Sequence, residues 1–177
     1  MKIGFCGTMS VGKTTLVNSL RELPEFKDYE TRTERSKYLR DLGIPLNTDS
    51  TLKGQTIFLA ERCSELLQDN IITDRTVIDV MAFTSQAKSI NYKDKQDFIN
   101  LAVDLISEYD YIFYVDPVGV ELEDNGVRTI DAKYRDEINY MIDFYITKHS
   151  FRINNLVRIH GSNEERIEMV KNALFNS

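Results

Sequence analysis

The chain has 177 residues, which favours one domain with room for a sizeable core. Its 42% hydrophobic and 28% charged residues are typical of a soluble globular protein, and no apolar run approaches the ~20 residues of a membrane span. A net charge of −6 disfavours a nucleic-acid partner, although it leaves room for a local basic pocket. The two cysteines, Cys6 and Cys63, make no disulfide framework and favour a reduced, cytoplasmic protein.

Short apolar strands alternate with amphipathic helices along the sequence. We expect strands at Lys2–Cys6, at "NIIT" before Asp74, at Tyr111–Val115 and at Leu156–Ile159. A further short strand, the second in chain order, is expected where the loop Pro24–Glu34 leads. Helices are expected over Lys13–Leu23, Thr51–Leu67, Asp94–Glu108 and Asp131–Lys148. A basic helix that ends at Leu42 is expected after the second strand, and the last helix is expected to open with a capping box from Ser162 to Glu165. This alternation predicts an α/β fold, with a five-stranded parallel sheet and helices on both faces, in a single domain over residues 1–177. Ligands of such sheets gather at the carboxyl ends of the strands.

Residues 7–14, the phosphate loop, read Gly-Thr-Met-Ser-Val-Gly-Lys-Thr and match G-x-x-x-x-G-K-[ST], between a strand and a helix. This motif predicts a P-loop NTPase, because the loop amides and the helix N-terminus bind nucleotide phosphates. The predicted nucleotide-binding residues are Gly7, Ser10, Val11, Gly12, Lys13, Thr14 and Thr15. We expect Lys13 to reach the β- and γ-phosphates of ATP, and the Thr14 hydroxyl to bind Mg²⁺.

The segment after the third strand favours a kinase over a regulatory GTPase. The sequence lacks the guanine-reading Asn-Lys-x-Asp, to which Thr147–Ser150 is the nearest approach, and it lacks Asp-x-x-Gly after the third strand. Asp74 and Arg75 stand there instead, across the sheet from the phosphate loop. We expect Asp74 to hold Mg²⁺ or its water, and Arg75 to clamp an acceptor or stabilise transferring charge. A surface ion pair or a helix cap is the alternative interpretation.

A basic segment, Thr31–Arg40, follows the second strand. Within it Glu34 is a candidate general base for an acceptor hydroxyl, and Arg32 and Arg35 are candidates for binding the substrate, for example through an acceptor phosphate. An ordinary solvated helix face would carry the same charges. Gln55, on the next helix, is a candidate for hydrogen-bonding an acceptor base.

The charged segment around residues 119–136 suits a lid that closes over the nucleotide. Arg128 and Arg135 would then approach the phosphates and exclude water, which protects the donor from hydrolysis. An ordinary acidic loop would have a similar composition. His149 and His160 are too isolated to indicate a metal site or a triad.

Five segments together resemble the AAA-type P-loop kinases grouped with the nicotinamide riboside kinase domain of NadR-like proteins. They are "GTMSVGKTTL", "TERSKYL", "ITDRTVIDVMAF", "DNGVRTIDAKYRDEI" and "GSNEERIEMV", and they also look, more broadly, like segments of thymidylate and deoxynucleoside kinases. The resemblance implies ATP·Mg²⁺ as donor and a nucleoside or nucleotide as acceptor. It also implies donor binding by Gly12, Lys13 and Thr14, a reaction centre at Asp74-Arg75, and Arg128 as a lid arginine. Lys37 departs from the family's Glu-x-x-Arg pattern, and a lysine cannot bind an acceptor phosphate bidentately.

The sequence therefore predicts an ATP-dependent kinase that transfers the γ-phosphoryl group to a nucleoside or (deoxy)nucleoside monophosphate. The predicted catalytic residues are Lys13, Glu34, Asp74, Arg75, Arg128 and Arg135, with Glu34 or Asp74 as the base; the substrate-binding residues are Arg32, Arg35, Gln55 and Arg75, and the metal ligands are Thr14 and Asp74. Two alternatives stay open: a kinase of modified bases in DNA, like some phage relatives, and a regulatory ATPase or GTPase module. A homodimer also stays open, and the basic cluster around Glu34 leans toward an acceptor that already carries a phosphate.

Overall fold

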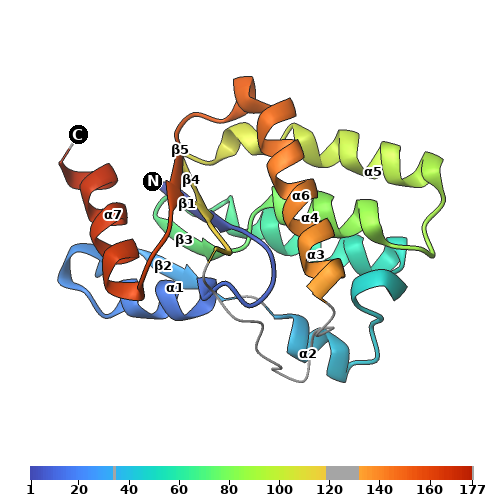
Figure 1. Cartoon of the computed structure of the whole chain (residues 1–177), viewed down its shortest axis with the longest axis horizontal. Helices are drawn as coiled ribbons and strands as arrows, with labels where there is room; N and C mark the ends of the chain where they lie inside the picture. The colour runs from blue at the N-terminus through green and yellow to red at the C-terminus, as the bar shows by residue number, and fades with distance from the viewer. Residues whose placement is uncertain (34, 119–131, 177) are drawn as a thin grey trace.

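The computed structural model describes residues 1–33, 35–118 and 132–176. Within these residues five strands form one sheet: β1 (Lys2–Cys6), β2 (Glu30–Arg32), β3 (Ile71–Asp74), β4 (Tyr111–Val115) and β5 (Leu156–Ile159). The strand order is β2-β3-β1-β4-β5, and every neighbouring pair is parallel. The predicted α/β fold with a five-stranded parallel sheet is confirmed (Figure 1).

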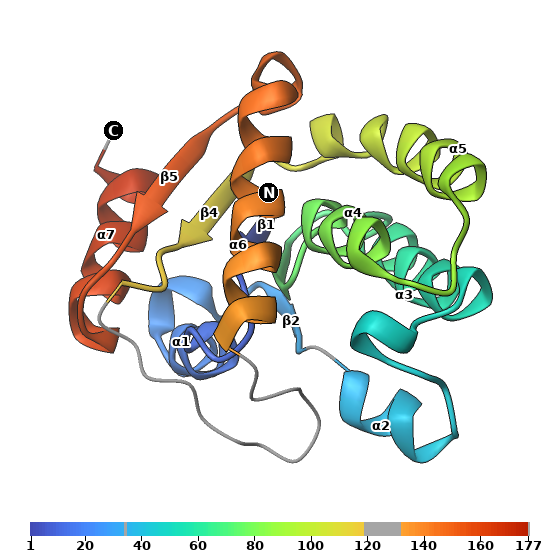
Figure 2. The ribbon, with the colours of Figure 1, turned by 45° about the vertical axis from the view of Figure 1, so that its right-hand side comes forward.

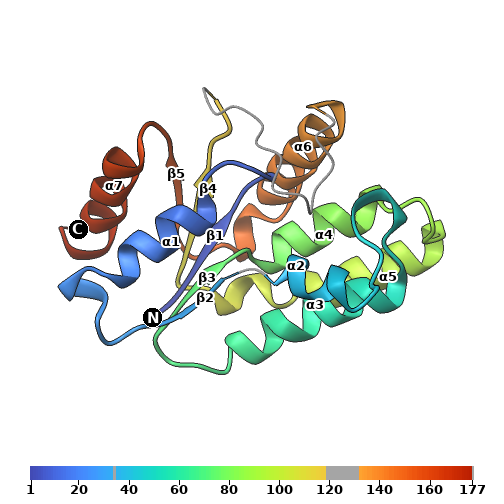
Figure 3. The same cartoon turned by 90° about the horizontal axis from the view of Figure 1, so that it is seen from below.

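Helices cover both faces of the sheet, as predicted. They are α1 (Lys13–Arg21), α2 (Ser36–Asp41), α3 (Leu52–Glu65), α4 (Val77–Gln86), α5 (Tyr92–Val103), α6 (Ala132–Lys148) and α7 (Asn163–Phe175). Figure 3 shows α1 and α7 on one side of the strands and α3 to α6 on the other. No helix in the described part of the chain is long and apolar enough to cross a membrane.

Two helices differ from the sequence-based expectation. Helix α4 was not expected as a separate element; it begins after Thr76, whose side chain forms a capping box with Asp79. Helix α5 begins before Asp94, because the side chain of Asn91 accepts a hydrogen bond from the Asp94 amide at 2.9 Å. It also ends before Glu108, and a 3₁₀ turn over Ile106–Glu108 takes up the rest of the expected segment.

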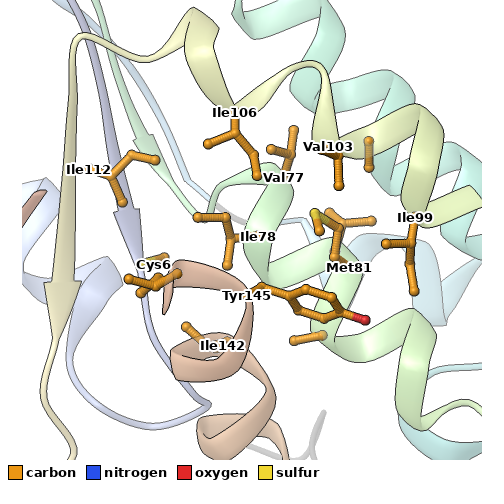
Figure 4. Packing of buried hydrophobic residues seen from close by; sticks show 14 of the residues in the cluster. Cys6, Val77, Ile78, Met81, Ile99, Val103, Ile106, Ile112, Ile142 and Tyr145 are labelled. Atoms are coloured by element: carbon orange, nitrogen blue, oxygen red, sulfur yellow. The ribbon is translucent and has the colours of Figure 1, made fainter. Parts of the chain in front are cut away.

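Helix α4 is the centre of the larger core. Seven of its ten residues are buried, including Ile78 and Met81. Figure 4 shows these side chains packed with Val103 of α5 and with Ile142 and Tyr145 of α6. A helix that is apolar on nearly all sides must be surrounded by other elements. This packing holds α4 in a fixed place against the sheet, directly after the predicted reaction centre at Asp74 and Arg75.

The smaller core joins α1 and α7 to the opposite face of the sheet. Leu16 and Leu20 of α1 and Val170 of α7 are fully buried there, and the rings of Phe5 and Phe113 stack on neighbouring strands at 5.1 Å. The carboxyl ends of the strands lie at one end of the sheet, where the phosphate loop, α2 and the start of α6 also lie (Figure 1). At that end Phe5 of β1 pairs in register with Asp74 of β3, so the ends of these two strands are adjacent.

Candidate functional site

The phosphate loop passes from β1 into α1 through residues that favour unusual backbone angles. Gly7 has φ 150, and a Cβ there would lie 2.8 Å from the Val115 carbonyl oxygen. Gly12 has φ 83 and is the N-cap of α1, without a side chain that could accept from the helix amides. The first amides of α1 are therefore available to a ligand or to water.

Lys13 places its charge across the loop. The side chain is 4% exposed, and Nζ donates to the carbonyl oxygens of Gly7 at 2.7 Å and Thr8 at 2.6 Å. The geometry therefore places a positive charge where a nucleotide's phosphates are predicted to bind.

Thr14 and Asp74 meet at the ends of β1 and β3. The Thr14 hydroxyl donates to Asp74 Oδ2, and Asp74 is 1% exposed. A hydroxyl and a carboxylate are both ligands that Mg²⁺ uses when phosphates and water complete its coordination. The described residues contain no group of three or more His, Cys, Asp or Glu that could hold a metal ion by themselves. The oxygen ligands present therefore fit a Mg²⁺ ion bound together with phosphates.

Arg75 has an unfavourable backbone conformation, with φ 96. Its side chain is buried, Nη1 donates to Asp79 Oδ1 at 3.2 Å, and the guanidinium lies 4.9 Å from the Phe83 ring centroid. The other non-glycine residues with positive φ in the described chain are Ser10 of the phosphate loop and Asn47. Such strain persists only where the surrounding structure enforces it, and it gathers at functional sites.

Asp79 connects the phosphate loop to Arg75, a role that the sequence analysis missed. The carboxylate is fully buried; Oδ1 accepts from the Gly7 amide at 3.2 Å and from Arg75 Nη1 at 3.2 Å. Oδ2 accepts from the amide and the hydroxyl of Thr76 at 2.8 and 3.0 Å. Thr76 and Asp79 signal only a helix cap in the sequence, so nothing there indicated that the carboxylate also holds the loop. The Gly7 amide, a predicted nucleotide contact, donates to Asp79.

Arg166 of α7 supports the phosphate loop from the other core, and it too was missed. The side chain is 5% exposed; Nη1 donates to the Val11 carbonyl oxygen at 2.6 Å and Nη2 to that of Asp116 at 3.4 Å. Burial lowers the pKa of Arg166, and the Asp116 charge acts against this shift. Val11, a predicted nucleotide-binding residue, is itself a fully buried core residue.

The remaining predicted donor-side residues lie in several places. Ser10 is half-buried, Thr15 is exposed on α1, and Arg135 is half-buried in the first turns of α6. The Thr8 hydroxyl donates to the Arg135 carbonyl oxygen at 2.9 Å, which ties α6 to the phosphate loop. Of the expected lid, residues 132–136 belong to α6. Glu34, Arg128 and the rest of that lid lie outside the described residues.

A pocket, the Arg75 pocket, lies beside the reaction centre between α2, α3 and α4. It is lined by Ser36, Leu46, Asn47, Ser50, Gln55, Phe58, Arg62, Arg75, Val80 and Phe83. Gln55, predicted to bind an acceptor base, is 3% exposed and shares this pocket with Arg75. The structure thus brings these two predicted residues together. Phe58 and Phe83 were missed, because apolar residues at helical spacing indicate only a core.

Arg62 adds a buried charge to this pocket. The side chain is 1% exposed, and Nη2 and Nε each lie 2.6 Å from a carboxylate oxygen of Glu65. Burial raises the pKa of Glu65, and the Arg62 charge opposes that shift. The pair was missed because charged residues three apart on a helix are usually solvated.

Arg32 and Arg35 lie elsewhere. Both side chains are more than half exposed; Arg32 pairs with Glu30 at 3.8 Å and Arg35 with Glu61 at 3.3 Å. They line a separate hollow beside β2, together with Glu61 and Glu65. The structure therefore does not bring these two predicted substrate-binding arginines to Gln55.

The fold is shared with two kinds of kinase and with the NadR protein. A deoxyadenosine kinase from M. mycoides with bound dCTP matches with a TM-score of 0.72 and 18% identity over 100% of both chains. The NadR protein in complex with NR has a TM-score of 0.75 and 16% identity over 96% of this chain, which spans 50% of NadR. A thymidylate kinase from Ehrlichia chaffeensis has a TM-score of 0.63 and 17% identity over 97% of both chains.

These likenesses confirm, at the level of the fold, the family resemblance that the sequence indicated. No curated protein matches the chain in sequence. Residues 2–166, which include the phosphate loop and Arg166, match a family described as an AAA domain. Because this match covers nearly the whole chain, the protein belongs to the AAA domain family of P-loop proteins.

Proposed function

We propose that the protein is an ATP- and Mg²⁺-dependent kinase that transfers the γ-phosphoryl group of ATP to a nucleoside or (deoxy)nucleoside monophosphate. One observation carries the proposal: the Asp79 carboxylate accepts from both the Gly7 amide and Arg75. Arg75 also lines the pocket that contains Gln55. A donor on the phosphate loop and an acceptor in the pocket would thus be neighbours, as in-line transfer requires.

At the donor end, the protein supplies positive charge and fixed dipoles. Lys13 and the N-terminus of α1 would neutralise the phosphates of ATP. Thr14 and Asp74 would hold Mg²⁺, which when bound neutralises charge on the phosphate oxygens. Little covalent chemistry is asked of these residues, because positioning and electrostatics lower the barrier.

At the acceptor end, Gln55 offers both a donor and an acceptor to a base, in a pocket that Phe58 and Phe83 also line. Arg75 would stabilise the phosphoryl group as it moves. Asp74 accepts a hydrogen bond from Thr14 and is a proposed metal ligand. We therefore favour Glu34 as the base that takes the proton from the acceptor's hydroxyl group. Arg128 and Arg135 stay candidates for the lid.

The proposal is tested by ADP formation from ATP and Mg²⁺ with a panel of acceptors. The panel contains nucleosides, nucleoside monophosphates, nicotinamide riboside and hydroxymethylated DNA. We expect one small acceptor to raise turnover well above the rate with ATP alone, and the Lys13→Ala variant to lose that stimulation. Stimulation by DNA alone would favour the modified-base kinase. No stimulation by any acceptor would favour the regulatory nucleotide-binding module.

A further inference from the structure

We infer that the acceptor is a nucleoside without a phosphate. This inference rests on the proposed function and narrows its substrate class. The observation is that each described arginine lining the Arg75 pocket is paired with its own buried carboxylate: Arg62 with Glu65, and Arg75 with Asp79. The pocket therefore contributes little net charge of its own.

Arg62 is held by Glu65 through a charge-assisted hydrogen bond from Nη2 to Oε1 at 2.6 Å and a second ion-pair contact, from Nε to Oε2, at the same distance. Both side chains are buried. If Arg62 turned to a substrate phosphate, the Glu65 carboxylate would lose its partner inside the protein, which is strongly unfavourable. Arg62 is thus poorly suited to bind an anionic acceptor.

Among the described residues that line the pocket, Arg75 is the other cation, and the transferring phosphoryl group already needs it. Its Nη1 lies 3.2 Å from Asp79 Oδ1, and its guanidinium stacks over Phe83. An acceptor monophosphate would add roughly two negative charges at the place where the γ-phosphate of ATP arrives. Binding such an acceptor calls for a further cation at this point.

The basic segment after β2 does not supply that cation in the described structure. Arg32 and Arg35 line a separate hollow, and each lies next to a glutamate, Glu30 or Glu61. The walls of the Arg75 pocket are instead largely apolar, with Leu46, Val80 and the two phenylalanines. A neutral base and sugar match these walls, whereas a phosphate does not.

The test compares kcat/KM for nucleosides with kcat/KM for their own 5′-monophosphates, with ATP and Mg²⁺, and identifies the product as a mono- or diphosphate by chromatography. We expect at least one nucleoside to be preferred over its monophosphate by about tenfold or more. A preference for the monophosphate would overturn the inference and leave the proposed kinase standing. Transfer to neither compound would overturn the proposed function itself.

A variant tests the charge argument. Glu65→Gln keeps the shape of the side chain but leaves Arg62 facing the more distant Glu61 carboxylate, 4.0 Å from Nη2, so the monophosphate-to-nucleoside ratio of kcat/KM should rise by about tenfold. Glu30→Gln removes the same charge from an exposed pair and should leave the ratio unchanged. An equal ratio in Glu65→Gln and wild type, with the fold verified by circular dichroism, would overturn the pairing of Arg62 as the reason for selectivity.

Discussion

The phosphate loop and the Arg75 pocket meet at Arg75 and Asp79, yet they are built from different parts of the chain. The loop is one contiguous segment whose geometry comes from backbone angles at Gly7, Ser10 and Gly12. The pocket is formed by side chains from α3, α4 and the segments around them. Helices α3 and α4 are separate along the chain and lie side by side in the fold (Figure 2). A main-chain site recognises what all nucleotides share, their phosphates. A side-chain site can change its ligand by a few substitutions on the surrounding helices.

The largest effect is expected from the loop's one charged side chain. Lys13→Ala should lower kcat/KM for transfer by about 10²-fold or more, because it removes charge stabilisation from the transferring group. The circular dichroism spectrum should be unchanged, since the Nζ of Lys13 donates to carbonyl oxygens within the phosphate loop itself. Lys93→Ala is the matched control, because Lys93 is exposed and pairs with Asp97 on the surface. Full activity in Lys13→Ala would contradict the donor site.

A substitution in the pocket should affect the acceptor alone. Gln55→Leu keeps the approximate size of the side chain but removes its amide, so the KM for the acceptor should rise by about tenfold or more. The KM for ATP should stay the same, because the loop does not depend on this side chain. Steady-state kinetics with each substrate varied in turn would measure both constants. An equal rise in both would mean that the two regions do not act separately.

A change in backbone conformation should affect ATP binding more at Gly12 of the phosphate loop than at Gly43, which follows α2. Gly12 and Gly43 have φ 83 and 80, so an alanine at either position should cost about 1–2 kcal/mol of folding free energy. A Cβ at Gly12 would also lie 3.2 Å from Arg166 Nη1, whereas a Cβ at Gly43 meets nothing within 4 Å. Gly12→Ala should therefore raise the KM for ATP several-fold, and Gly43→Ala should not. Urea unfolding and ATP kinetics of both variants would separate strain from function; equal KM values would argue against the Arg166 contact.

The same difference explains what the sequence could predict. The phosphate loop is readable because its residues are adjacent and its pattern reports a backbone geometry. Asp79 and Arg166 are not readable in this way, since each acts through a partner more than 70 residues away along the chain. Helix α4 was missed because its apolar residues face all directions and leave no helical period to detect. Gln55 was selected, yet whether it binds a base stays a prediction.

The smallest effect is expected at the basic segment after β2. Arg35→Ala should change the KM for the acceptor by less than about twofold and the stability by under ~1 kcal/mol, because exposed ion pairs contribute little. The reason is its place: Arg35 lies over the Tyr38 ring and beside Glu61, in a hollow separate from the one that contains Gln55. Acceptor kinetics of Arg35→Ala and Arg32→Ala would measure this. A rise above about fivefold in either variant would mean that this segment closes onto the acceptor during turnover, and the boundary of the acceptor site would then extend from the helices to β2.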